Sequence, residues 1–137
     1  MTRCIFCDIV AGLAPASVVH RDERCVAFMD LYPITPGHLL VVPRRHAASL
    51  AELDPADGGH LFVTAQRMAA ALRRSGLRCE GVNLFLADGE AAGQEIFHVH
   101  LHVVPRFAGD GVKVRAATGR PTRGELDAHA AAIAAVL

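Results

Sequence analysis

The chain has 137 residues, which is enough for one hydrophobic core and too few for two independent domains. Its 14 basic and 14 acidic residues balance, which excludes the strongly basic surface typical of proteins that bind nucleic acid or anionic membranes. No apolar run reaches the roughly 18–20 residues that span a bilayer, and residues 1–12 lack the apolar core of a signal peptide. We therefore expect a cytoplasmic domain with reduced cysteines that binds a small molecule.

The first third of the chain predicts a short helix, a hairpin and a strand. Residues 4–11 are expected to form a turn or short helix, and residues 17–20 and 25–31 a hairpin that turns through residues 21–23. Residues 32–37 contain two prolines and a glycine, which predicts a rigid loop before an apolar strand at residues 38–43.

A long helix is predicted at residues 55–75, between Asp54 as N-cap and Gly76 as the stop signal. Strands are expected at residues 81–86 and 97–105, separated by a glycine-containing loop at 87–94. A loop at 106–121 precedes a last helix, for which Thr122 and Glu125 have the spacing of a capping box. The pattern predicts one α+β domain over residues 1–137, with about five antiparallel strands, one long helix and short terminal helices. Its core is expected at residues 4–111, followed by a loop and helix at 112–137.

Three histidines alternate with apolar residues in the segment HVHLHVV at positions 98–104. Because a strand sends alternate side chains to opposite faces, His98, His100 and His102 are expected on one face and the residues between them in the core. The preceding loop, DGEAAGQ at 88–94, has backbone amides suited to cradling an anion. The alternative is a surface strand whose histidines have no function, and strict alternation of three histidines argues against it.

This pattern resembles the signature of the histidine triad family, His-φ-His-φ-His-φ-φ, in which φ is apolar. The resemblance runs from Cys4 to about Gly111 and includes CIFCDIVAG, PITPGHLLVVPRRH and AAGQEIFHVHLHVVPRF. It is strongest to the bacterial branch that has an N-terminal Cys-x-x-Cys. The third histidine separates the chain from uridylyltransferase relatives, which have glutamine there, and favours transfer of the nucleotidyl group to water. The resemblance also implies a homodimer joined through a continuous sheet.

The resemblance implies a nucleotide hydrolase or nucleotidyl transferase in which His100 attacks a phosphorus atom. A neutral imidazole can attack through nitrogen and form a phosphoramidate that water cleaves. The amides around Gly93 and Gln94, together with His102, are expected to hold the phosphate oxygens, with Gln94 placed where the leaving group departs. The expected role of His38 is orientation or proton traffic. The complete expected catalytic set is His100, His102, His98, Gln94 and His38.

The resemblance also implies a purine nucleoside site. Apolar residues of the first elements are expected to enclose the base, and Asp30 to accept hydrogen bonds from both ribose hydroxyls. For each apolar residue, ordinary core packing is the alternative. The expected set is Ile5, Phe6, Ile9, Phe28, Asp30, Leu31, Leu40, Gly93, Gln94, Glu95, Ile96, His100 and His102. The chain differs from many relatives in having Ala87 in place of an asparagine and Glu95 in place of a serine or threonine.

The Cys4-x-x-Cys7 pair supplies two thiolates, and a tetrahedral zinc ion needs two more ligands. The resemblance implies that these are His46 and His98, so that the zinc is structural and the chemical step requires no cofactor. One alternative is a pair of buried thiols without metal. Another is a catalytic zinc shared by the triad histidines, which would occupy the nucleophile. Outside these motifs, Cys25 and Cys79 are expected to be small apolar residues, and His20, His60 and His129 to be exposed.

The favoured function is hydrolysis of a purine nucleoside phosphoramidate, or a related adenylated compound, through a nucleotidyl-His100 intermediate. The nearest alternative is a dinucleoside polyphosphate hydrolase, which differs in its leaving group. An alternative of another class is a nucleotide- and zinc-binding regulatory module with little catalysis. In each case the expected partner is a small purine nucleotide and not a nucleic acid or a membrane.

Overall fold

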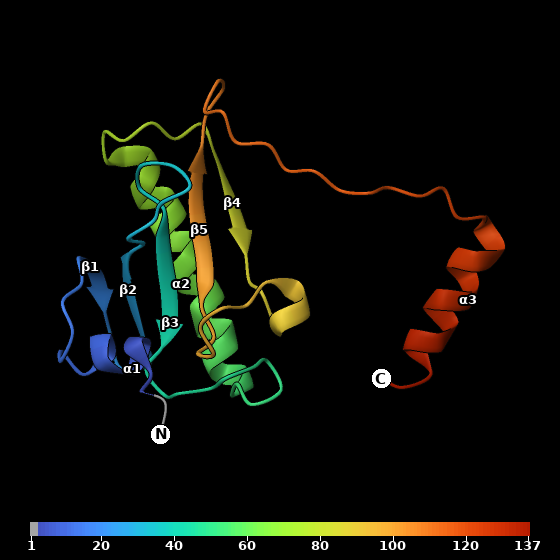
Figure 1. Ribbon diagram of the computed structural model, residues 1–137, viewed down its shortest axis with the longest axis horizontal. Coiled ribbons are helices and arrows are strands. Elements are labelled where there is room, and N and C mark those ends of the chain that lie inside the picture. The colour runs from blue at the N-terminus through green and yellow to red at the C-terminus, as the bar shows by residue number, and fades with distance from the viewer. Residues whose placement is uncertain (1–2) are drawn as a thin grey trace.

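A five-stranded antiparallel sheet forms the centre of this computed structural model, which describes residues 3–137 (Figure 1). The sheet order is β1-β2-β3-β5-β4. The strands are β1 (Val18–Arg21), β2 (Cys25–Met29), β3 (Leu39–Pro43), β4 (Gly81–Phe85) and β5 (Leu101–Arg106). The helices are α1 (Ile5–Val10), α2 (Pro55–Arg74) and α3 (Arg123–Ala134), with a 3-10 turn η1 (Glu90–Ala92). The predicted α+β fold is confirmed.

The long helix α2 covers one face of the sheet (Figure 1). It begins where the Asp54 side chain accepts a hydrogen bond from the Ala56 N–H, and its chain turns away at Gly76, which has a positive φ of 86°. Its apolar side packs on alternate residues of the strands, because successive strand residues point to opposite faces. The resulting core contains Cys25, Ala27, Leu39, Val41, Ala47, Leu61, Ala65, Met68, Leu72, Val99 and Val103.

The opposite face of the sheet is covered in part by the short helix α1. Phe6 and Ile9 of α1 pack on the other set of strand residues, which includes Phe28 and Leu40. A helix of only six residues cannot cover a five-stranded sheet, so part of this face stays open. His100 lies beside this partial cover, where its ring contacts that of Phe6 with 5.1 Å between ring centroids.

Strand β5 begins at Leu101 and not at Phe97 as predicted. The backbone groups of the segment before Leu101 form hydrogen bonds outside the sheet. The Val99 N–H donates to the Ala47 carbonyl, and the His98 carbonyl accepts from the His100 ring. Because these backbone groups have partners outside the ladder, the segment does not pair as a strand. The alternation of side chains nevertheless persists, since Val99 and Val103 lie in the α2 core.

The C-terminal helix α3 stands apart from the sheet at the end of an extended segment (Figure 1). The Thr122 hydroxyl accepts a hydrogen bond from the Glu125 N–H, as the predicted cap requires. Every residue from 113 to 137 is exposed, including His129 as predicted. Among the described residues, no helix is both long and apolar enough to cross a membrane.

The prediction that His20 and His60 are exposed is wrong. Both side chains are half-buried and donate through Nε2 to one oxygen of Asp22, at 2.9 and 2.8 Å. The other Asp22 oxygen accepts the backbone N–H groups of Arg24 and Cys25, which shapes the turn between β1 and β2. Although burial opposes it, the combined effect of these hydrogen bonds lowers the pKa of Asp22 well below its ordinary value. The cluster therefore ties this hairpin to α2.

Candidate active site and metal site

A cavity of about 890 Å³ opens beside α1, on the face of the sheet opposite α2. It is lined by every residue predicted to bind the nucleotide except Gln94. Further lining residues that the sequence did not indicate include Met29, Tyr32, Ile34, Phe85 and Leu86. Phe85 stacks on the ring of His102, with 4.0 Å between ring centroids and 12° between planes. A sequence-based prediction could have found Phe85 only by pairing the two predicted strands, which places Phe85 opposite His102.

The His100 ring is oriented by its own backbone. Its Nδ1 lies 2.8 Å from the carbonyl oxygen of His98. A carbonyl only accepts, so Nδ1 carries the proton, and in the neutral ring Nε2 is left with a free lone pair. Because His100 also lines the cavity, the residue is arranged as a nucleophile or base toward a ligand there.

A chain of hydrogen bonds assigns the opposite tautomer to His102. The Ile34 N–H donates to Nδ1 of His38 at 3.0 Å, so the neutral His38 ring carries its proton on Nε2. That Nε2–H donates to Nδ1 of His102 at 2.9 Å. The proton of neutral His102 is therefore on Nε2. The cavity thus holds one imidazole with a free lone pair, His100, and one that offers an N–H donor, His102.

The loop at residues 32–37, which contains Ile34 of this hydrogen-bond chain, packs closely against its surroundings. Gly37 has φ of 101°, and a Cβ there would lie 3.1–3.2 Å from the side chains of Leu77, Leu72 and Pro105. The Thr35 hydroxyl, which is buried, donates to the Pro105 carbonyl at 2.6 Å. The loop predicted at residues 32–37 is present, and its contacts place His38 beside the triad.

Burial lowers the pKa values of His38 and His102, and for His102 the neighbouring His100 and His38 add to the effect and bring its pKa to about 4. The folded state therefore binds fewer protons than the unfolded chain between about pH 4 and pH 6.5. We expect the free energy of unfolding to decrease as the pH falls through this window, by on the order of 2–3 kcal/mol for His102. Urea unfolding across the pH series checks this.

The matched variant for this pH dependence is His102→Gln, in which the amide oxygen can still accept from His38. Its unfolding free energy is expected to fall less steeply between pH 6.5 and pH 4, while the wild-type zinc site is present in both proteins. Identical slopes for the two proteins would contradict the assignment of the low pKa to His102.

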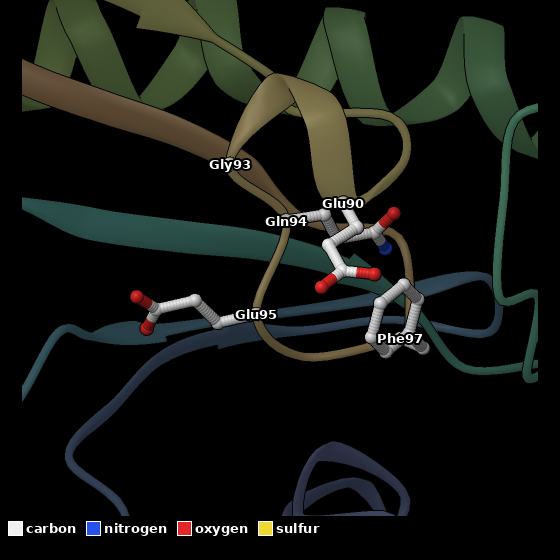
Figure 2. Close-up of a pocket in the computed structure, with 5 residues that line it drawn as sticks. All are labelled: Glu90, Gly93, Gln94, Glu95 and Phe97. Carbon is white, nitrogen blue, oxygen red and sulfur yellow. The ribbon is translucent and has the colours of Figure 1, made fainter.

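The loop before the histidines differs from its predicted role. The Gly93 N–H donates to the Glu90 carbonyl at 2.9 Å and the Gln94 N–H to the Gly89 carbonyl at 3.1 Å, so neither amide is available for a phosphate. The Gln94 side chain is buried and bonded to backbone groups of Gly89, Ala48 and Ile96. It shapes the loop and does not line the histidine cavity. Figure 2 shows it beside Glu90, Glu95 and Phe97.

The free amides lie one and two residues further along. No acceptor for the N–H groups of Glu95 and Ile96 is present within residues 3–137, and both residues line the histidine cavity. Gly93 makes this turn possible, since its φ of 93° is unfavourable for residues with a Cβ. The loop therefore offers two backbone donors beside the histidines.

Asp30 lies at the end of β2, where its side chain borders the cavity. One carboxylate oxygen accepts the Tyr32 N–H at 2.8 Å, and the other lies 3.5 Å from Nε2 of His38. These contacts orient the carboxylate. Each oxygen keeps a lone pair with which to accept a hydroxyl of a ligand.

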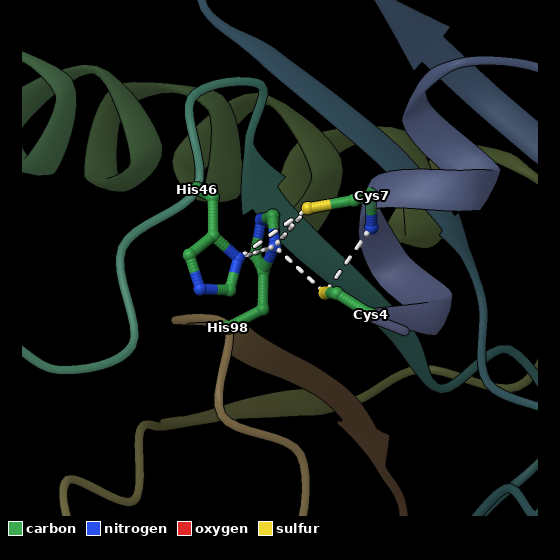
Figure 3. A group of neighbouring side chains, drawn as sticks. All are labelled: Cys4, Cys7, His46 and His98. Atoms are coloured by element: carbon green, nitrogen blue, oxygen red, sulfur yellow. Dashed lines mark hydrogen bonds between the residues drawn. The ribbon is translucent and has the colours of Figure 1, made fainter. Parts of the chain in front are cut away.

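A second group of side chains, Cys4, Cys7, His46 and His98, brings four donor atoms together at the start of α1 (Figure 3). The Cys4 Sγ accepts the Cys7 N–H, so the first helical turn places both thiols on one side. Nδ1 of His98 lies 3.4 and 3.5 Å from the two sulfurs and 3.2 Å from Nδ1 of His46. The Nε2–H of His98 donates to the Pro43 carbonyl at 2.8 Å, which leaves the Nδ1 lone pair facing the group.

These separations fit a tetrahedral zinc ion. Ligand bonds of about 2.0–2.3 Å place the donor atoms about 3.3–3.8 Å apart, and two thiols with two imidazoles are a common structural zinc set. Burial and the adjacent Cys4 raise the pKa of Cys7 to about 11, so a cation is needed to hold it as a thiolate at neutral pH.

The alternative of a catalytic zinc shared by the triad does not fit the described residues. His98 belongs to the cysteine group and His102 to a group with Asp30 and His38, whereas His100 belongs to no potential metal group within residues 3–137. The His98 ring, predicted to be both catalytic and a zinc ligand, turns toward the cysteines and does not line the cavity. Cys25 is fully buried, as expected of a small apolar residue, although its sulfur contacts Asp22 and Thr64.

Comparison with known proteins identifies the family. The model of the HIT domain matches residues 11–109. The chain belongs to the HIT family. An uncharacterized HIT-like protein of Mycobacterium tuberculosis is 39% identical over 127 residues, which cover 93% of this chain and 86% of that protein.

Two solved structures are informative about the chemistry of HIT proteins. A zinc-bound histidine triad family protein from Mycobacterium smegmatis has a TM-score of 0.79 and 40% identity, covering 98% of this chain and 97% of that one. A HIT family hydrolase from Legionella pneumophila has a TM-score of 0.65 and 32% identity, covering 74% of this chain and 91% of that one. Family membership supports a nucleotide hydrolase or transferase in general, and the four-residue group together with the zinc-bound relative supports zinc.

Proposed function

We propose that this HIT protein hydrolyses purine nucleoside phosphoramidates, or related adenylated compounds, through a nucleotidyl-His100 intermediate. The observation that carries the proposal is the 2.8 Å hydrogen bond from His100 Nδ1 to the His98 carbonyl, which leaves an unprotonated Nε2 on a residue that lines the cavity. His102 has the complementary tautomer. One histidine is thus prepared to attack and the other to donate.

The cavity has separate regions for the parts of a nucleotide. The base binds against the apolar wall that α1, β2, β3 and the segment after β2 supply, formed by Ile5, Phe6, Ile9, Phe28, Leu31 and Leu40. The Asp30 carboxylate accepts hydrogen bonds from the ribose hydroxyls. The phosphate then lies at His100, within reach of the His102 Nε2–H and the free amides of Glu95 and Ile96.

In the first step, Nε2 of His100 bonds to phosphorus while the P–N bond of the substrate breaks, and the amine departs with a proton taken from solvent. In the second step, a water oxygen bonds to phosphorus, the P–Nε2 bond breaks, and the water releases a proton to solvent. The products are the amine and the nucleoside monophosphate. The N–H donors stabilise the charge that develops on the phosphate oxygens, which is typically worth 10²–10³-fold per donor.

The role proposed for zinc is structural. Cys4, Cys7, His46 and His98 would hold it, and it would cross-link α1, the loop after β3 and the segment before β5. Because His98 supplies the carbonyl that orients His100, holding His98 in place also holds the nucleophile. No step of the reaction passes through the metal.

A side-by-side comparison of two substrates tests the function. We expect release of AMP from an adenosine phosphoramidate with a higher kcat/KM than from a diadenosine polyphosphate of equal concentration. The reverse order would replace the proposal by its nearest alternative, which uses the same nucleophile and another leaving group. Tight binding of AMP with turnover of neither substrate would identify a regulatory binding module.

The assembly and location that accompany this function are also part of the proposal. We propose a homodimer in which two sheets join, since both edge strands of the five-stranded sheet, β1 and β4, are antiparallel and open to pairing. We propose a cytoplasmic location, where thiols such as Cys4 and Cys7 stay reduced and able to bind zinc. Analytical ultracentrifugation at micromolar concentration tests the dimer.

A further inference from the structure

The charged residues that line the histidine cavity, apart from the histidines, are both acidic. They are Asp30 and Glu95, and no lysine or arginine of the described chain lines this cavity. A second hollow of about 490 Å³ lies beside it, and Gly93 and Glu95 line both. Glu95 therefore lies at the border between the two hollows.

The two carboxylates differ in how far their charge is compensated. Asp30 accepts the Tyr32 N–H and lies 3.5 Å from His38. Glu95 is exposed, and its carboxylate has no hydrogen-bond or ion-pair partner within residues 3–137. An uncompensated charge at the border of a cavity acts on whatever charge enters or leaves it. Glu95 is thus the carboxylate of this cavity whose charge no described neighbour offsets.

We propose that Glu95 selects the leaving group by charge, favouring amines that carry a second positive charge and disfavouring anionic leaving groups. This inference rests on the proposed function. In an in-line displacement the leaving group departs on the side of phosphorus opposite the attacking Nε2 of His100. With the base held at the apolar wall beside α1, we place the leaving group at the border of the cavity that Glu95 lines. There it meets the carboxylate of Glu95, and no lysine or arginine of the described chain lines the cavity to offset that charge.

Two other residues of the second hollow, Glu90 and Phe97, also favour cations. Glu90 lines the second hollow and adds another carboxylate, and the Phe97 ring is 50% exposed there. In Figure 2 the Glu90 carboxylate lies toward the Phe97 ring, whereas the Glu95 side chain extends to the other side of its own backbone. The face of an aromatic ring attracts ammonium and guanidinium groups. A leaving group with a terminal ammonium is therefore attracted by both kinds of group, whereas a polyphosphate is repelled by two carboxylates.

Selection by the charge of Glu95 would favour phosphoramidate hydrolysis over its nearest alternative, dinucleoside polyphosphate hydrolysis. A nucleoside polyphosphate leaving group carries several negative charges, and a charge of the same sign a few ångströms away opposes its binding in the transition state. For an exposed carboxylate in water we expect an effect of roughly fivefold in kcat/KM for each unit of charge on the leaving group. Added salt screens the effect because Glu95 is exposed to solvent.

The test uses three adenosine phosphoramidates whose amine parts have equal length and end in an ammonium, a methyl or a carboxylate group. For the wild type we expect kcat/KM to decrease in that order, by about 25-fold from first to last at low salt, and the spread to narrow at high salt. In Glu95→Gln we expect the kcat/KM values of the three substrates to differ by about fivefold or less. In Glu95→Lys we expect the carboxylate substrate to have the highest kcat/KM and the ammonium substrate the lowest.

Glu23→Gln is the matched control, because it removes the same charge from an exposed residue in the β1–β2 turn, at the other end of β2 from Asp30. It should leave the order and spread unchanged. An unchanged spread in Glu95→Gln, or a wild-type preference for the carboxylate substrate, would overturn the inference while leaving the proposed function intact. The absence of turnover of all three substrates, with no adduct on His100, would instead reject the proposed function.

Discussion

Replacing His100 with alanine is expected to lower kcat for AMP release by about 10⁴-fold or more while changing the affinity for AMP by less than about fivefold. Removing the nucleophile abolishes the covalent route, whereas the base wall and Asp30 stay in place to bind the nucleotide. Single-turnover kinetics give the rate, and calorimetric titration with AMP gives the affinity.

His129→Ala is the matched control for this loss, since it removes an imidazole from the exposed helix α3. We expect it to retain wild-type kcat. His100→Asn provides a second variant, because the shorter polar side chain tests whether the loss follows the nucleophile and not the space left beside Phe6. Retention of more than a tenth of the wild-type kcat in both His100 variants would eliminate covalent catalysis by this residue.

Protein purified without a histidine tag is expected to contain about one zinc ion per chain, and Cys4→Ser combined with Cys7→Ser is expected to contain none. Loss of a ligand bound only by the folded state removes about 3–5 kcal/mol of stability when its concentration is about 10³ times its dissociation constant. For a chain of this size that corresponds to a decrease in Tm of about 10 °C. Metal analysis and thermal unfolding measure the two effects.

The control for the zinc prediction is Cys79→Ser, because Cys79 contacts the Gly81 carbonyl and belongs to no potential metal group among the described residues. It should keep its zinc and lose at most about 1 kcal/mol. Wild-type protein without zinc, or zinc retained after both Cys4 and Cys7 are replaced, would show that the group does not bind the metal. Partial loss of activity together with zinc would support the link from His98 to His100.

The fold was predictable because its elements follow from local patterns. The apolar spacing between Asp54 and Gly76 predicts α2, and the alternation around β5 predicts which side chains enter the core. The start of β5 was not predictable. It depends on the His98 ring reaching Pro43 and the cysteines, and on the His98 carbonyl accepting from His100, which are contacts that hydrophobic periodicity does not encode.

Some residues of the candidate site were likewise predictable from the sequence, and others were not. The resemblance supplied the histidines, the cysteines and the wall of the cavity, and the structure brings these residues together. It placed the loop's phosphate donors around Gly93 and Gln94, whereas the turn η1 uses these two amides for its own hydrogen bonds and the free amides belong to Glu95 and Ile96. Nor does any motif link Asp22 with His60, which lies 38 residues away and meets it only when α2 packs on the hairpin.

Intact-protein mass spectrometry after a rapid, acid-free quench with an adenosine phosphoramidate tests the central claim most directly. The account predicts a transient gain of one adenylyl mass in the wild type, absent in His100→Ala, that appears before AMP is released in bulk. AMP release without any adduct at single-turnover times, together with turnover by His100→Ala, would contradict a nucleotidyl-His100 intermediate.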